Sequence, residues 1–261
     1  MIVEKIWTAN AYRNFNYLIA CPNSGEALAI DPLDYKKCIK IAKKNSWNIT
    51  QILNTHEHWD HIAGNDALVK ATSAKVIAHE NAKDKIPNMD IGVNHGDIIK
   101  IGKNIELECL DTPGHTLSHI CLFLRTEEPV LFSGDALFNA GAGNCHFGGD
   151  PNELYKTFTQ LEKLPLETRI YPGHDYLISN LNFTLDREPQ NKDAMEMLRK
   201  YENDDPAEIV TSLKDEMKIN VFLRLQNEEI INKLSESFPD LESKPSPKKV
   251  FLKLRELRNH W

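Results

Sequence analysis

The sequence lacks several features, and each absence narrows the class of protein. No stretch approaches the roughly 20 apolar residues that a membrane helix needs, and the first residues do not have the pattern of a signal peptide. The five cysteines are odd in number and show no C-x-x-C spacing, so a disulfide framework is not expected. The net charge of −7 indicates no broad basic surface for nucleic acid or anionic lipid. We therefore expect a monomeric, cytoplasmic protein that binds neither nucleic acid nor a membrane.

Glycine is absent from the last third of the chain. All 12 glycines lie at or before Gly173. Because glycine serves turns and close backbone approaches, its disappearance indicates a helical segment. Within this segment, Ser246 can cap a final helix whose first turn holds Pro247. We therefore expect two domains, over residues 1–174 and 175–261, the second of them helical.

The first of these domains alternates short β-branched runs with polar turns and a few helices. Runs typical of strands cover residues 16–20, 27–30, 51–53, 75–78, 120–124 and 130–132. Asp34 and Asp150 each stand where they can cap a following helix. This alternation predicts a mixed α/β fold.

The densest group of metal-ligand side chains is the stretch THEHWDH, which follows a buried strand and opens the next element. Side chains two residues apart in extended backbone point to the same side, so His56 and His58 can converge on one point. Asp60 and His61, beyond the turn, face a second point. We expect Trp59 to pack beneath the loop. Taken alone, such a histidine cluster could equally be a solvated loop.

Three further ligand-type side chains end apolar runs in glycine-marked turns, within the stretches TPGH, SGD and YPGH. Strand ends of this kind can build one site on a rigid scaffold. The candidate ligands then form two sets, His56, His58 and His115 in one and Asp60, His61 and His174 in the other, with Asp135 able to bridge them. Nitrogen and oxygen ligands in these numbers suit two divalent transition-metal ions, each with a position open for water. We expect zinc, with iron or manganese as alternatives.

The motifs THEHWDH, TPGHT, SGD and YPGH, in this order, resemble the signature of the metallo-β-lactamase superfamily. Within it, the Trp of the first motif, the stretch GDALFNAG and the helical C-terminal segment resemble the glyoxalase II, or hydroxyacylglutathione hydrolase, family. The resemblance implies an αββα sandwich that carries the metals, followed by a helical domain that helps to bind substrate. It also implies hydrolysis of S-D-lactoylglutathione, or a related acyl thioester, by a hydroxide held between the metals. Asp60 and Asp135 would then take part in catalysis.

The same resemblance implies a site for the glutathione part of the substrate. Tyr176 matches a family tyrosine just after the last metal histidine, and Arg255 and Arg258 lie one turn apart on the last helix, where the family has basic residues. Asn144 and His146 stand where the family usually has a cation and an aromatic residue. A lost cation removes a contact worth about 1.5–3 kcal/mol, so the thiol carrier could differ from glutathione. Without the resemblance, both arginines could equally form a solvated helix face.

Two other functions are compatible with this superfamily. An iron-dependent persulfide dioxygenase would use one metal and ligands equivalent to His56, His115 and Asp135, and it generally lacks the long helical tail. The presence of the second ligand set favours the hydrolase. A phosphodiesterase or nuclease would have a basic groove or an inserted domain, and this acidic chain indicates neither.

Overall fold

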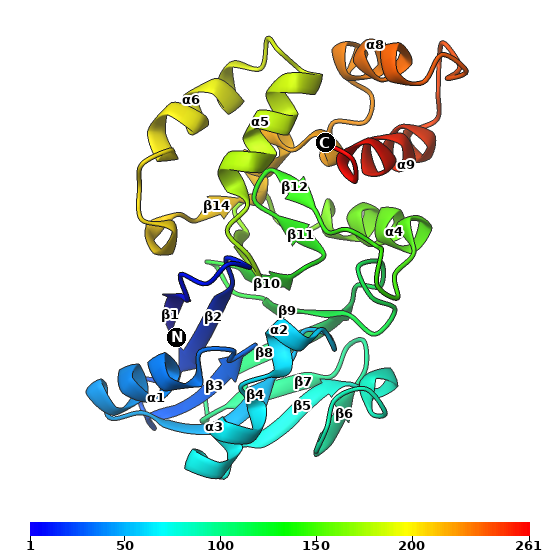
Figure 1. Ribbon diagram of the computed structural model, residues 1–261. Helices are drawn as coiled ribbons and strands as arrows, with labels where there is room; N and C mark the ends of the chain where they lie inside the picture. Colours follow the sequence, from blue (N-terminus) through cyan, green and yellow to red (C-terminus); the bar gives the residue numbers. More distant parts are fainter.

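A computed structural model describes all 261 residues, and it contains two six-stranded sheets with helices on their outer faces (Figure 1). The first sheet has the order β1 (Ile2–Trp7), β2 (Phe15–Ala20), β3 (Glu26–Ile30), β4 (Asn48–Leu53), β5 (Lys75–His79), β6 (Ile91–Val93). The second has the order β14 (Thr211–Ser212), β13 (Arg169–Pro172), β10 (Val130–Gly134), β9 (Ile120–Leu124), β8 (Ile105–Asp111), β7 (Ile98–Ile101). A separate hairpin joins β11 (Leu137–Phe138) to β12 (Gly141–Ala142).

Nine α-helices and three short 3-10 turns complete the chain. The helices of the first part are α1 (Tyr35–Lys44), α2 (Trp59–Ile62), α3 (Asn65–Thr72) and α4 (Pro151–Leu161). Those of the last part are α5 (Leu177–Arg187), α6 (Lys192–Tyr201), α7 (Leu213–Ile219), α8 (Glu228–Ser237) and α9 (Pro247–Arg258). The 3-10 turns cover Glu80–Ala82, Pro206–Glu208 and Val221–Leu223. None of these helices has the length and apolar character to cross a membrane.

Strand β2 shows why the sheets lie in the middle of the molecule. Its alternate residues Phe15, Tyr17 and Ile19 belong to the apolar core between the two sheets. Leu18 and Ala20 point the other way, into a core shared with α1 and α3. Because successive strand residues face opposite sides, a strand that is apolar throughout must be covered on both faces. The helix–sheet–sheet–helix layering confirms the predicted αββα sandwich.

The helix starts follow the predicted caps. The side chains of Asp34, Asp150 and Ser246 each accept a hydrogen bond from a backbone N–H in the first turn of α1, α4 and α9. Pro151 and Pro247 occupy first-turn positions, where no backbone donor is needed.

The segment after Gly173 is helical, as predicted, but it is joined closely to the sandwich. Its two-residue strand β14 pairs with β13 and so extends the second sheet. Phe222 and Phe251 pack in one core with Phe158 of α4 and Leu131 of β10. The helices therefore cover the outer face of the second sheet, and the two parts share hydrophobic core (Figure 1).

Candidate metal centre

The predicted ligands meet at one edge of the sandwich, where strands of both sheets end. THEHWDH and TPGH follow β4 and β8, and SGD and YPGH span the ends of β10 and β13. Two glycines make room for the approach. Gly134 adopts φ +47°, and a Cβ there would collide with Thr55 and His119. A Cβ on Gly173 would collide with Asp135, so these glycines are needed for the strand ends to converge.

The structure brings all seven candidate ligands together. In the first set, Nδ1 of His58 lies 3.1 Å from Nε2 of His56 and 2.9 Å from Nε2 of His115. In the second, Nε2 of His174 lies 3.2 Å from Nε2 of His61 and 3.4 Å from Oδ2 of Asp60. Asp135 lies between the sets, with Oδ2 3.4 Å from Nε2 of His115 and 3.2 Å from Nε2 of His174. The ligand atoms form three mutually close groups, each of which could hold a metal ion.

In several of these imidazoles, a backbone carbonyl fixes the ring nitrogen that faces away from the cluster, here called the outer nitrogen. His58 Nε2 donates to Phe147 O at 3.0 Å, His115 Nδ1 to Asn144 O at 2.7 Å, and His174 Nδ1 to Tyr12 O at 2.6 Å. A carbonyl oxygen can only accept, so the ring proton is on the outer nitrogen, and in the neutral ring the inner nitrogen carries a lone pair.

The positions of the inner nitrogens and of the carboxylate oxygens show whether the donor set fits metal ions. Lone pairs that face each other across about 3 Å repel unless a cation lies between them. In addition, Oδ1 of Asp135 is buried without a hydrogen-bond partner. Imidazole nitrogens with hydrogen-bonded outer N–H groups and an unpaired buried carboxylate oxygen are what a transition metal requires of its ligands. The residues present therefore fit a dinuclear metal site.

Burial and neighbouring charges shift the pKa values inside the cluster in both directions. Burial lowers the pKa of His115 to about 4. Burial also opposes protonation of His61, but the carboxylates of Asp135 and Asp31 outweigh it and raise the pKa of His61 to about 10. Burial would raise the pKa of Asp135, yet His174 and His61 hold it well below its usual range. The buried carboxylates and imidazoles of the cluster thus shift each other's pKa values strongly.

Two supporting residues were not predicted from the sequence. Asp31, at the end of β3, accepts hydrogen bonds from His61 Nδ1 at 2.9 Å and from Thr55 Oγ1 at 2.7 Å. Asn14 donates through Nδ2 to Oδ2 of Asp60 at 3.0 Å. An acid directly after a buried strand was a signal that could have revealed Asp31. Nothing in the sequence near Asn14 pointed to Asp60.

Glu57, between the first two histidines, points away from the cluster. Its carboxylate accepts hydrogen bonds from Lys85 Nζ at 2.6 Å, Ser118 Oγ at 2.9 Å and Thr116 Oγ1 at 3.0 Å. Thr116 and Ser118 lie on the loop that carries His115. Glu57 therefore ties the two loops of the first ligand set to each other.

The prediction that Trp59 packs beneath the loop is wrong. Its side chain is 66% exposed, and its ring meets Tyr12 edge-on with the centroids 6.4 Å apart. Trp59 opens α2, a helix of only four residues, which turns the ring outward between His58 and Asp60.

A polar cavity of about 300 Å³ adjoins the centre and contains every residue predicted to bind substrate. Its lining residues are Phe138, Ala142, Asn144, His146, Tyr176, Asn180, Arg255, Arg258 and Asn259. The cavity, here called the arginine pocket, has two cations and no acidic side chain. It meets the centre at Tyr176, whose ring stacks on His174 with the planes 4° apart. An anionic molecule in the pocket would thus extend towards the ligand cluster.

The two arginines of α9 play different parts. Arg255 is buried, donates from Nη1 to the carbonyls of Ala142 at 2.7 Å and Gly143 at 3.1 Å, and has its pKa lowered to about 10 by burial. Arg258 is partly exposed and donates to Ser179 Oγ at 3.0 Å. The alternative of a solvated helix face is therefore wrong for Arg255, which fixes the pocket wall and supplies charge.

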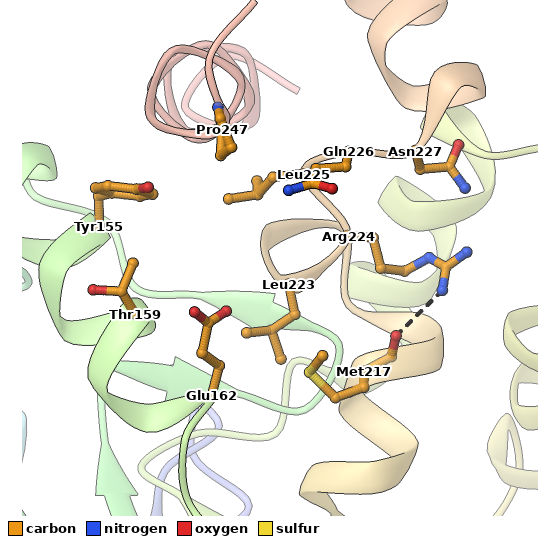
Figure 2. A pocket seen from close by; sticks show the side chains of 10 residues that line it. All are labelled: Tyr155, Thr159, Glu162, Met217, Leu223, Arg224, Leu225, Gln226, Asn227 and Pro247. Carbon is orange, nitrogen blue, oxygen red and sulfur yellow. Dashed lines mark hydrogen bonds between the residues drawn. The ribbon is translucent and has the colours of Figure 1, made fainter.

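A larger hollow, of about 430 Å³, lies away from the ligands, between α4 and the loop before α8 (Figure 2). Its arginine, Arg224, donates to Met217 O and forms an ion pair with the buried Glu188. The guanidinium is thus already paired, and no candidate ligand lines the hollow. Size alone therefore does not identify the substrate site.

Comparison with known proteins agrees with this geometry. Residues 17–174 match the model of the metallo-beta-lactamase superfamily, and residues 175–261 match that of the hydroxyacylglutathione hydrolase C-terminus. Hydroxyacylglutathione hydrolases of Nitrosococcus oceani and a Polaromonas species are 60% and 61% identical over 263 residues, with all of each chain covered. The crystal structure of ETHE1 from Myxococcus xanthus shares 27% identity and a TM-score of 0.69, covering 99% of this chain and 98% of that one.

The αββα sandwich with ligands at its strand ends thus defines a metal-dependent hydrolase of the metallo-β-lactamase superfamily. Within that superfamily the chain belongs to the hydroxyacylglutathione hydrolase family, whose members are thioester hydrolases. The resemblance of the motifs to this family is confirmed.

Proposed function

We propose that this enzyme hydrolyses S-D-lactoylglutathione, or a closely related glutathione thioester, to D-lactate and glutathione. The observation that carries the proposal is the adjacency of two sites, a ligand cluster suited to two metals and a pocket with two arginines and no acid. Glutathione is a peptide with two carboxylates, which match those charges. Full-length relatives named as hydrolases support this reading over the persulfide dioxygenase.

The proposed metal ligands are His56, His58 and His115 for one ion, Asp60, His61 and His174 for the other, and Asp135 for both. We propose zinc, with iron or manganese as alternatives, because a nitrogen and oxygen donor set accepts all three. When bound, such ions lower the pKa of a water and polarise a carbonyl. The support for this assignment is the short spacing of the inner atoms and the fixed outer nitrogens.

The chain's own residues orient the reaction. Asp60, held by Asn14, is placed to orient the attacking water and accept its proton. The carrier carboxylates are bound by Arg258 and by Nη2 of Arg255, whose other two guanidinium nitrogens donate to the pocket wall, while Tyr176 borders the thioester. Water adds to the thioester carbon, the bond from carbon to sulfur breaks, and the thiolate leaves towards the pocket. Asn144 and His146 then contact the carrier without supplying the family's usual cation.

We further propose the division of labour predicted from the sequence. Residues 1–174 form the catalytic, metal-binding domain, and residues 175–261 form the substrate-binding domain, with the chain working as a monomer in the cytoplasm. The five cysteines are all unpaired in the structure, which supports a reducing compartment. The contribution of α9 to the arginine pocket supports the role given to the second domain.

A paired assay on the purified protein tests this function. We expect close to two transition-metal ions per chain and loss of the thioester absorbance of S-D-lactoylglutathione, with no oxygen uptake from glutathione persulfide. Oxygen uptake without thioester cleavage would overturn the proposal in favour of the dioxygenase. Cleavage of an acyl thioester of another thiol, with little activity on glutathione thioesters, would instead show that the thiol carrier is not glutathione.

A further inference from the structure

The most exposed large apolar side chains of the whole protein gather around the candidate metal centre. Phe147 is 75% exposed, Trp59 66% and Tyr12 55%, more than any other large apolar residue. A solvated apolar side chain is unremarkable by itself. These three have the highest exposure, and they lie on two loops and at the start of α2, three segments that all reach the same site, which indicates a common role.

These three aromatic residues, here called the aromatic rim, are held in place by the centre itself. The carbonyl of Tyr12 accepts the hydrogen bond from His174 Nδ1, and that of Phe147 accepts the hydrogen bond from His58 Nε2. Trp59 lies between His58 and Asp60 in the chain and contacts the ring of Tyr12. The backbone of Tyr12 and of Phe147 is thus hydrogen-bonded to a candidate ligand, and Trp59 is next to two candidate ligands in the sequence.

The rim also lies where the centre is open. Of the seven ligands, only His58 and Asp60 are partly exposed, whereas the other five are buried. These two flank Trp59, so solvent reaches the cluster past the rim. No rim residue lines the arginine pocket. A thioester has two ends, and only one of them, the carboxylated carrier, suits two arginines.

We propose that Tyr12, Trp59 and Phe147 form the binding surface for the acyl end of the substrate, and that contact with these rings raises kcat/KM for acyl groups that are larger and more apolar than lactoyl. The proposal rests on the proposed function, because it assigns the carrier to the arginine pocket. An aromatic acyl group can pack against the Tyr12–Trp59 pair or against Phe147 beside His58, whereas the small, polar lactoyl group covers little of these rings. The rim therefore acts on specificity between acyl groups.

Steady-state kinetics on two substrates with the same carrier tests the proposal. S-lactoylglutathione and the aromatic S-mandeloylglutathione are compared for the wild type and for Trp59→Ala, Tyr12→Ala and Phe147→Ala, which all keep the backbone carbonyls. We expect each substitution to lower the ratio of kcat/KM for mandeloyl over lactoyl by about tenfold. Leu166→Ala, an equally apolar side chain that is 47% exposed on a loop without ligands, should leave the ratio unchanged.

The outcomes separate the two proposals. Equal losses on both substrates, or none, would overturn the rim while leaving the hydrolase standing. Failure of the wild type on the lactoyl ester with turnover of the mandeloyl ester would overturn the proposed substrate and support the rim. Failure on both esters overturns both proposals. If the rim instead serves self-association or binding to a membrane, the variants would change in oligomeric state or bind lipid vesicles less, while the kcat/KM ratio would stay unchanged. That result would overturn the proposal.

Discussion

The ligand cluster and the arginine pocket share a border at Tyr176, yet they are built in opposite ways. The cluster stands on strand ends of a rigid sandwich, and backbone carbonyls fix the outer nitrogens of its imidazoles. The pocket is assembled from the β11–β12 hairpin and the loop after it, the start of α5, and α9. Helix α9 lies more than 100 residues along the chain from the hairpin, and the bond from Arg255 to Ala142 joins them. The rigid strand ends hold the ligand atoms in a fixed geometry. The pocket provides substrate affinity, and its residues can change without moving the ligand atoms.

If this division holds, removing a cluster ligand should abolish turnover. Asp135→Ala removes the carboxylate between the two sets, and we expect kcat to fall by at least about a thousandfold, since such a centre supplies several kcal/mol of transition-state stabilisation. Metal content measured by atomic emission should fall with it. Asp240→Ala, which removes an exposed carboxylate, is the matched control. Near-normal turnover by the Asp135 variant would place the chemistry elsewhere.

Removing a pocket cation should affect binding alone. For Arg258→Ala we expect KM for the glutathione thioester to rise about 10- to 100-fold with kcat nearly unchanged, because one charge-assisted contact is lost. Lys253→Ala on the same helix removes a partly exposed charge that is paired with Glu256, outside the pocket, and should leave both kinetic constants unchanged. A fall in kcat at constant KM would mean that the pocket takes part in the chemical step.

A smaller effect should follow when the support of the cluster is weakened and its ligands are kept. Glu57→Gln removes the charge that binds Lys85 and joins the two loops of the first set. We expect metal affinity, measured by competition with a chelator, to fall about tenfold. Glu106→Gln breaks the exposed pair with Lys100 and serves as the control. Unchanged affinity would show that the loops are held without this carboxylate.

The smallest expected effect concerns Glu216 of α7, which joins the helical segment to the turn of the β11–β12 hairpin. Glu216 is buried and accepts hydrogen bonds from Ala140 N, Thr211 Oγ1 and Asn220 Nδ2, and burial raises its pKa to about 7. A folded pKa above the unfolded value means that this group favours folding below about pH 4.5 and loses that contribution as pH rises through 7.

The matching measurement is the melting temperature between pH 5 and pH 8. The wild type should lose several degrees over this range from Glu216, and Glu216→Gln should lose less, because an amide does not titrate. Parallel curves for the two proteins would show that Glu216 is charged at both pH values. At any one pH, kcat should differ little between the wild type and Glu216→Gln.

The same contrast explains what the sequence could predict. The cluster was foreseen because its ligands end apolar strands within short motifs, so local pattern and position agreed. Asp31 carries that same signal, a carboxylate directly after a buried strand, and could have been found. Asn14 could not, because it reaches Asp60 across 46 residues of chain. The burial of Arg255 was also beyond the sequence, since an amphipathic helix does not reveal which polar residues another segment covers.

The loop between β1 and β2 sets the order in which the centre can form. Its Arg13 is hydrogen-bonded to Asp175, 162 residues further along the chain, and the adjacent Tyr12 and Asn14 hold His174 and Asp60. During synthesis, THEHWDH emerges long before His174, so the second ligand set stays incomplete until about two thirds of the chain has been made. Contacts of such long range form late in folding. The second ligand set is therefore completed by the closing of this loop and not by the appearance of the histidine motif.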